Sequence, residues 1–114
     1  MSTRYFVRLP DPALARGSVP ELSFRAHGAD AFAQELQQAL RSPELFERWR
    51  QTQDDPDSID PQLGVVDPGA QVSGQQSDLH IDLDVVSTVN GKVLQQRLRW
   101  LAGHAWQLRD VREI

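Results

Sequence analysis

The sequence predicts an α+β domain in which a twisted, largely antiparallel sheet carries two helices packed on one face. Alternating apolar and polar residues near both ends of the chain predict strands. Two consecutive segments between them have apolar residues at helical spacing. Asn90-Gly91, the strongest two-residue hairpin signal, lies between alternating segments in the last third of the chain. The expected order of elements is therefore ββααβββ, with the helices covering the apolar face of the sheet.

Residues 4–9 and residues 21–27 are the two strands expected first. In the earlier segment Tyr5, Val7 and Leu9 share one face, because successive side chains of a strand alternate. The later segment alternates in the same way and ends at a glycine. Its expected inward residues are Leu22, Phe24 and Ala26.

Two short helices joined by a bend at Ser42 follow these strands. Asp30 is a plausible N-cap for the first helix. Ser42-Pro43 is a standard start signal for the second helix, since proline suits the first helical position. The apolar positions expected to face the core are Phe32, Ala33, Leu36 and Leu40 in the first helix and Leu45, Phe46 and Trp49 in the second.

Residues 52–77 predict a long acidic loop containing several prolines and glycines. Each proline in it follows an aspartate, and Asp-Pro favours the start of a turn. From residue 51 to residue 84 there are eight acids and no lysine or arginine. A loop of this length inside a compact domain tends to be functional, mobile or wrongly assigned as a loop.

The Asn90-Gly91 turn sets a register for the strands on either side of it. Leu83 then faces Leu98, and Ile81 faces Trp100. On the opposite face the same register pairs acids with bases, which favours it over a slipped one. These expected ion pairs are Asp84 with Arg97 and Asp82 with Arg99.

Residues 105–111 predict the last strand. A three-residue loop at 102–104 would set Trp106 opposite Trp100. The apolar phase shifts between Leu108 and Val111, which indicates either a β-bulge or the end of burial. In outline this arrangement is similar to helix-on-curved-sheet folds, including the cystatin-like and nuclear-transport-factor-like groups. The similarity is architectural, transfers no residues and implies no function.

Length and charge set the expected class of protein. The 114 residues fit a single globular domain, residues 1–114, which buries roughly two-thirds of its unfolded surface without metal or disulfide. There are no cysteines, so thiolate chemistry is excluded. The net charge is −4 with no basic stripe, which argues against nucleic acid and anionic membranes as partners. The N-terminal residues lack the apolar run of a signal peptide, so we expect a cytoplasmic protein without a cofactor.

His80, Asp82 and Asp84 form the sharpest candidate for chemistry, because alternation puts all three on one strand face. Imidazole and carboxylates are metal ligands. The arginines expected opposite the two acids would compete with a cation, so we interpret the trio as a charged strand face and predict no metal site. Hydrolysis by His80 with Asp82 or Asp84 is the least favoured hypothesis, and no nucleophile or phosphate-binding motif supports catalysis.

The acidic loop is the expected functional site. Its exposed carboxylates would attract a basic partner over long range. The favoured hypothesis is a non-enzymatic protein-interaction or regulatory module that binds a partner or self-associates, and catalytic residues are expected to be none. The alternative is a small-ligand or metal-binding domain with a pocket between helices and sheet. The residues predicted to bind a partner are Asp54, Asp55, Asp57 and Asp60.

Overall fold

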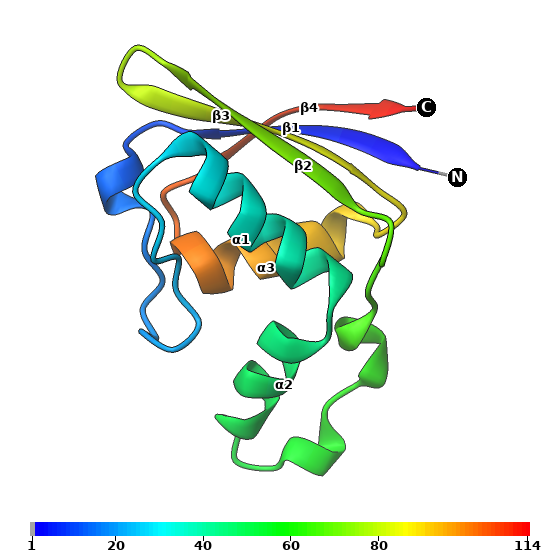
Figure 1. The fold of residues 1–114 in the computed structure, drawn as a ribbon. Coiled ribbons are helices and arrows are strands. Elements are labelled where there is room, and N and C mark those ends of the chain that lie inside the picture. Colours follow the sequence, from blue (N-terminus) through cyan, green and yellow to red (C-terminus); the bar gives the residue numbers. More distant parts are fainter. Residues whose placement is uncertain (1) are drawn as a thin grey trace.

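The computed structural model describes residues 2–114 and contains a four-stranded antiparallel sheet with strand order β2-β3-β1-β4 (Figure 1). Three α-helices and three short 3-10 turns complete the described chain. The main elements are β1 (Thr3–Leu9), α1 (Ala29–Arg41), α2 (Glu44–Gln51), β2 (Gln71–Ser77), β3 (His80–Ser87), α3 (Gly91–Ala102) and β4 (Gln107–Glu113). The 3-10 turns are Pro12–Leu14, Pro56–Ser58 and Pro61–Gly64.

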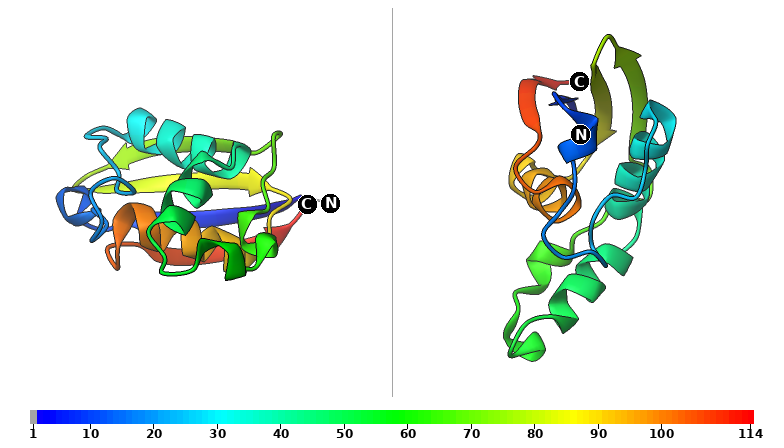
Figure 2. Two further views of the ribbon diagram at one scale, coloured as in Figure 1. Left: turned by 90° about the horizontal axis from the view of Figure 1, so that it is seen from below. Right: turned by 90° about the vertical axis from the view of Figure 1, so that its left-hand side faces the viewer.

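Helices α1 and α3 lie side by side on one face of the sheet, and the other face is left uncovered (Figures 1 and 2). Apart from α2, the order of elements is β-α-β-β-α-β. With this strand order it is the ferredoxin-like topology, in which each helix connects two strands that flank a third. The predicted fold class, an α+β domain with an antiparallel sheet covered by helices, is confirmed. The predicted order of elements within it is wrong at three segments, residues 21–27, 71–77 and 91–102.

The core lies between the sheet and the two helices. Strand β1 has the predicted alternation, with Tyr5, Val7 and Leu9 buried, and it pairs with both β3 and β4. Phe32, Leu36 and Leu40 of α1 and Leu94 and Leu98 of α3 are fully buried against this face. The predicted bulge is present, since the pairing of β1 with β4 shifts register between Phe6 and Val7.

The predicted hairpin at Asn90-Gly91 is wrong, because Asn90 caps a helix instead of forming a turn. Its side-chain oxygen accepts a hydrogen bond from the backbone N–H of Val93 at 2.9 Å, and α3 runs on from Gly91. Asparagine serves as well in an N-cap as in a type I′ turn. Gly103, with φ +64°, then ends the helix in the left-handed conformation that favours glycine.

Because residues 91–102 form a helix, the strand register expected around Asn90-Gly91 is wrong. Leu98 and Trp100 lie on α3, so they face neither Leu83 nor Ile81 as strand partners, and Trp106 does not lie opposite Trp100 on a neighbouring strand. Strand β3 pairs with β1 and β2 instead.

The predicted second strand at residues 21–27 is also absent from the sheet. Its alternation is nevertheless real, since Leu22, Phe24 and Ala26 are buried. The backbone N–H of Phe24 donates to the carbonyl of Leu101 at 2.8 Å, at the end of α3. A segment that turns at residues 19–23 and then follows the end of α3 can also bury alternate side chains, because a period of two reports which side chains are inward and not what the backbone pairs with.

The two predicted helices are confirmed as α1 and α2, but only α1 covers the sheet as expected, since α3 takes the place predicted for α2 (Figure 2). Gly28, not Asp30, is the N-cap of α1, and Asp30 lies in the first turn. The start of α2 is one residue later than expected, since Pro43 is its N-cap and Glu44 its first helical residue. The Ser42 hydroxyl accepts a hydrogen bond from the backbone N–H of Glu44 at 3.3 Å but does not cap the helix.

Residues 43–66 form a projection that we call the lobe. It contains α2 and the last two 3-10 turns, and it extends away from the sheet beyond α1 and α3 (Figure 2). The predicted loop at 52–77 is therefore ordered in part, and its last seven residues are strand β2. None of the helices in residues 2–114 is long and apolar enough to cross a lipid bilayer.

Candidate functional site

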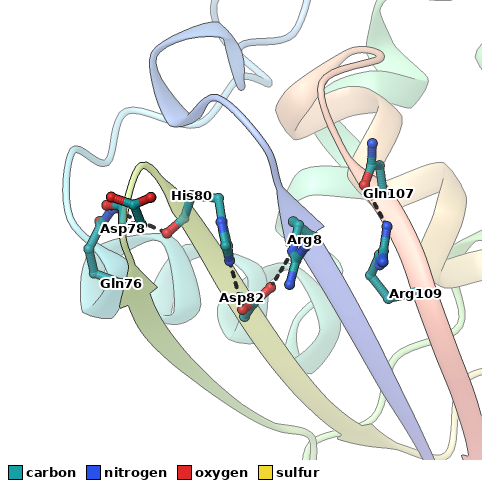
Figure 3. Close-up of polar contacts among 7 residues, drawn as sticks. All are labelled: Arg8, Gln76, Asp78, His80, Asp82, Gln107 and Arg109. Atoms are coloured by element: carbon teal, nitrogen blue, oxygen red, sulfur yellow. Dashed lines mark hydrogen bonds and ion pairs between the residues drawn. The ribbon is translucent and has the colours of Figure 1, made fainter.

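The uncovered face of the sheet carries paired charges. The Arg8 Nε donates to Asp82 Oδ1 at 2.9 Å, and His80 Nε2 lies 3.2 Å from Asp82 Oδ2 (Figure 3). Arg4 Nε donates to Asp84 Oδ1 at 3.0 Å. Both strand acids therefore have a basic neighbour one strand away, as expected, but the expected neighbours Arg97 and Arg99 are wrong, because those residues belong to α3.

These contacts engage both oxygens of Asp82. The hydrogen bond from Arg8 is the main cause that lowers the pKa of Asp82 below its ordinary value, and its proximity to His80 adds to it. A carboxylate held in this way is a poor proton acceptor near neutral pH. Within residues 2–114, no three His, Asp or Glu side chains are grouped so that they could hold a metal ion.

A shallow depression of about 530 Å³ lies on the same face. Phe6 forms part of its wall, and the guanidinium groups of Arg4 and Arg112 lie 5.2 and 5.4 Å from the centre of the Phe6 ring. Arg109, which the β4 bulge places here, also lines it. The Nη1 of Arg109 donates to Gln107 Oε1 at 3.2 Å (Figure 3). Cationic and aromatic groups thus meet beside this depression.

The four predicted partner-binding acids all lie in the lobe. Asp54, Asp55, Asp57 and Asp60 are exposed there, after α2 and around the two 3-10 turns. Asp57 is fully exposed, and its carboxylate is 3.8 Å from Arg50 Nη1. The lobe as a whole contains six acids and two bases. The structure brings the four residues into one segment, and their role in binding stays a prediction.

Two side chains hold the acidic segment in an ordered conformation. Arg50 Nη1 donates to the carbonyl of Pro56 at 3.1 Å, while Glu47 pairs with the same guanidinium at 2.9 Å. The Asp60 carboxylate accepts from the backbone N–H of Gln62 at 2.9 Å and so caps the last 3-10 turn. The carboxylates are therefore displayed on a structured backbone.

Asp67 anchors the chain where the lobe rejoins the rest of the protein. Its Oδ2 accepts from Ser87 Oγ at 3.0 Å and from the backbone N–H of Thr88 at 2.9 Å, and its Oδ1 accepts from Gly69 N–H at 2.9 Å. The bond from Thr88 is the main cause that lowers the pKa of Asp67. Sequence reasoning missed this role, because nothing local distinguishes Asp67 from the other Asp-Pro acids.

Arg97 is the residue that sequence reasoning misplaced most. It was expected on an exposed strand face, but its side chain is fully buried at the join between α3 and the lobe. A helical reading of the sequence could have found it, since position 97 lies four residues from Val93 and three from Leu94. The desolvation of Arg97 lowers its pKa to about 10.

Two of the three tryptophans lie at the same join. Trp49 of α2 stacks on Trp100 of α3 with ring centres 4.8 Å apart, and both are partly buried. Trp106 donates from its ring nitrogen to the carbonyl of Gly103 at 2.9 Å. His27 and His104 are exposed, in the positions expected of surface residues.

Comparison of the chain with protein families, with curated proteins and with solved structures gives no significant match. The ferredoxin-like topology itself assigns no activity, because this arrangement carries many unrelated functions.

Proposed function

We propose that this protein is a non-enzymatic interaction module of the cytoplasm whose lobe binds a basic surface on a protein partner. The observation that carries the proposal is the display of four exposed carboxylates on an ordered segment that projects from the sheet and helices.

The electrostatics of the lobe favour association with a cation-rich surface. The two lobe arginines are engaged with lobe acids, Arg48 with Glu44 at 3.7 Å and Arg50 with Glu47. The carboxylates of Asp54 and Asp55 form no ion pair within residues 2–114. Unpaired surface charges of one sign steer association and set its dependence on salt.

The test compares capture of partners by the wild type and by a variant with Asp54, Asp55, Asp57 and Asp60 all replaced by Asn. The matched control removes the same charge outside the lobe, through Glu21→Gln, Asp30→Asn, Asp78→Asn and Glu113→Gln, all of which are exposed. We expect a partner that the wild type and the control retain at low salt, and that high salt or the lobe variant releases. Equal retention by the lobe variant would refute the proposal.

A second candidate is binding of a small anionic ligand in the depression on the uncovered sheet face. Arg109 favours it, since its guanidinium forms no ion pair within the described residues while the other arginines of that face do. This depression differs from the pocket that the sequence-based alternative expected between helices and sheet, because the buried core fills that space. A thermal-shift screen of anionic metabolites tests this candidate. Stabilisation of the wild type that Arg109→Gln abolishes would support it, and the absence of any stabiliser would count against it.

A further inference from the structure

Arg97 is a buried cation without an ionic partner. Its side chain is 0 % exposed, and Nη2 donates to the backbone carbonyl of Val65 at 3.2 Å. Nε and Nη1 are buried with no hydrogen-bond acceptor. Within residues 2–114 no carboxylate forms a salt bridge with it. Buried charges in proteins are normally paired, so an unpaired guanidinium needs an explanation.

Aromatic rings surround this guanidinium and offset only part of its desolvation. Its central carbon lies 5.0 Å from the centre of the Trp100 ring and 5.9 Å from that of Phe46. Trp49 stacks on Trp100 from the lobe side. Ring faces attract a cation, but they offer no acceptor in the plane of its N–H groups. The site therefore has an apolar, ring-lined wall and unused donors.

Residues 61–66 of the lobe, which we call the cover, contact Arg97 through the carbonyl of Val65. Gly64 lies so close to Phe46 that an added Cβ would be 2.7 Å from two ring carbons. The backbone hydrogen bonds of this segment are local, from Leu63 to Asp60 and from Val65 to Gln62. Val65 is itself 41 % exposed. Opening this segment breaks the hydrogen bond from Arg97 to Val65 and the contact of Gly64 with Phe46, and leaves the hydrogen bonds of the sheet in place.

We propose that Arg97 anchors a binding site for a small aromatic carboxylate, which enters between α3 and the cover formed by residues 61–66. The carboxylate replaces the Val65 carbonyl and accepts hydrogen bonds from the guanidinium, whose planar donors suit two carboxylate oxygens. The ring of the ligand lies against Phe46 and Trp100. This inference is independent of the acidic docking surface, since it concerns the inner side of the lobe.

The test measures the thermal midpoint, Tm, of the intact protein with sodium benzoate, with benzamide as the uncharged isostere and with sodium acetate as the carboxylate without a ring. The variants are Arg97→Met, which keeps the length of the side chain without its charge, and Arg99→Met, which removes an exposed arginine from the same helix. At about ten times its Kd, benzoate is expected to raise Tm by roughly 5 °C.

We expect benzoate to raise the Tm of the wild type and of Arg99→Met, with a smaller effect of acetate and none of benzamide. Arg97→Met should show no benzoate effect. An equal rise in Arg97→Met, or an equal effect of benzoate and benzamide on the wild type at the same millimolar concentration, would overturn the proposal. The comparison of benzoate with benzamide uses the wild type alone, so it tests the proposal even if Arg97→Met fails to fold.

Discussion

The sheet with α1 and α3 differs from the lobe in how it uses its polar groups. On the sheet, the charges of the uncovered face other than Arg109 are paired with neighbours, as Arg8 is with Asp82. In the lobe, four carboxylates are exposed, and the join to α3 contains a buried arginine without an ionic partner. The two regions therefore differ in what they contain. The sheet and its two helices contain the buried core, whereas the lobe and its join to α3 contain exposed carboxylates and a buried arginine without an ionic partner.

The largest expected effect comes from a substitution in the core between the sheet and its two helices. Phe32 is fully buried and contacts Phe24 edge to face, with ring centres 4.9 Å apart. Phe32→Ala should lower the free energy of unfolding by about 3–5 kcal/mol, because it leaves a cavity. Urea denaturation measures this. The matched change in the lobe, Leu63→Ala, removes a partly exposed side chain and should cost about 1 kcal/mol or less. Equal losses would contradict the contrast between the two regions.

The next effect concerns the anchor between the two regions. Asp67→Ala removes three hydrogen bonds to a carboxylate and leaves the buried Ser87 hydroxyl without that partner. We expect the free energy of unfolding to fall by about 2–3 kcal/mol.

The same anchor predicts a dependence on pH. The pKa of Asp67 is lowered in the folded protein, so its contribution is present above the pKa of an unfolded aspartate, about 3.9, and is lost as pH falls through the folded value. Denaturation of the wild type and of Asp67→Asn between pH 7 and pH 3 checks this. The difference in stability between them should shrink toward acid, and a constant difference would contradict the assignment.

Arg97→Met should raise stability, in contrast to the other substitutions. Replacing a buried unpaired charge by an apolar side chain of similar length is expected to add about 1–3 kcal/mol. Thermal and urea denaturation at pH 7 measure it, with Arg99→Met as the control that should change little. A strong loss of stability would mean that the cation is needed to hold the lobe to α3, and the reading of Arg97 as unsatisfied would be wrong.

The smallest effect is expected on the uncovered sheet face. Arg8→Gln breaks the pair with Asp82, which is about 40 % exposed in its side chain, and should cost less than about 1 kcal/mol. The loss should disappear in high salt, which screens the pair. A loss as large as that of Asp67→Ala would show that the chain of contacts from His80 to Arg8 supports the sheet more than surface pairs do.

The sequence was informative where one physical signal stood alone. The alternation of Tyr5, Val7 and Leu9 predicted β1, and the apolar spacing in α1 and α2 predicted both helices. The phase shift after Leu108 indicated a bulge or the end of burial, and the structure has the bulge. The sequence-based prediction was wrong where the same residues are typical of two different structures. Asn90-Gly91 suits a turn and a helix start, and only the wider spacing of buried residues from Val93 to Ala102 distinguishes them.

The candidate sites were harder to predict for a different reason. The acids of the lobe could be named because exposed charge is visible in composition. Arg97 and Asp67 could not, since their roles depend on contacts with residues 32 and 20 positions away. A strand model of residues 91–102 also put Arg97 on the wrong surface, which turned an unpaired cation into an apparent partner for Asp84.

The Trp49–Trp100 stack gives the molecule an internal optical reporter. Two indoles at 4.8 Å couple their electronic transitions, so their near-ultraviolet circular dichroism depends on the contact between α2 and α3. Trp106, hydrogen-bonded near the start of β4, is outside that pair and supplies a reference signal from the sheet side. Movement of the lobe can therefore be followed without a label, and Trp106→Phe would leave the reporting pair in place.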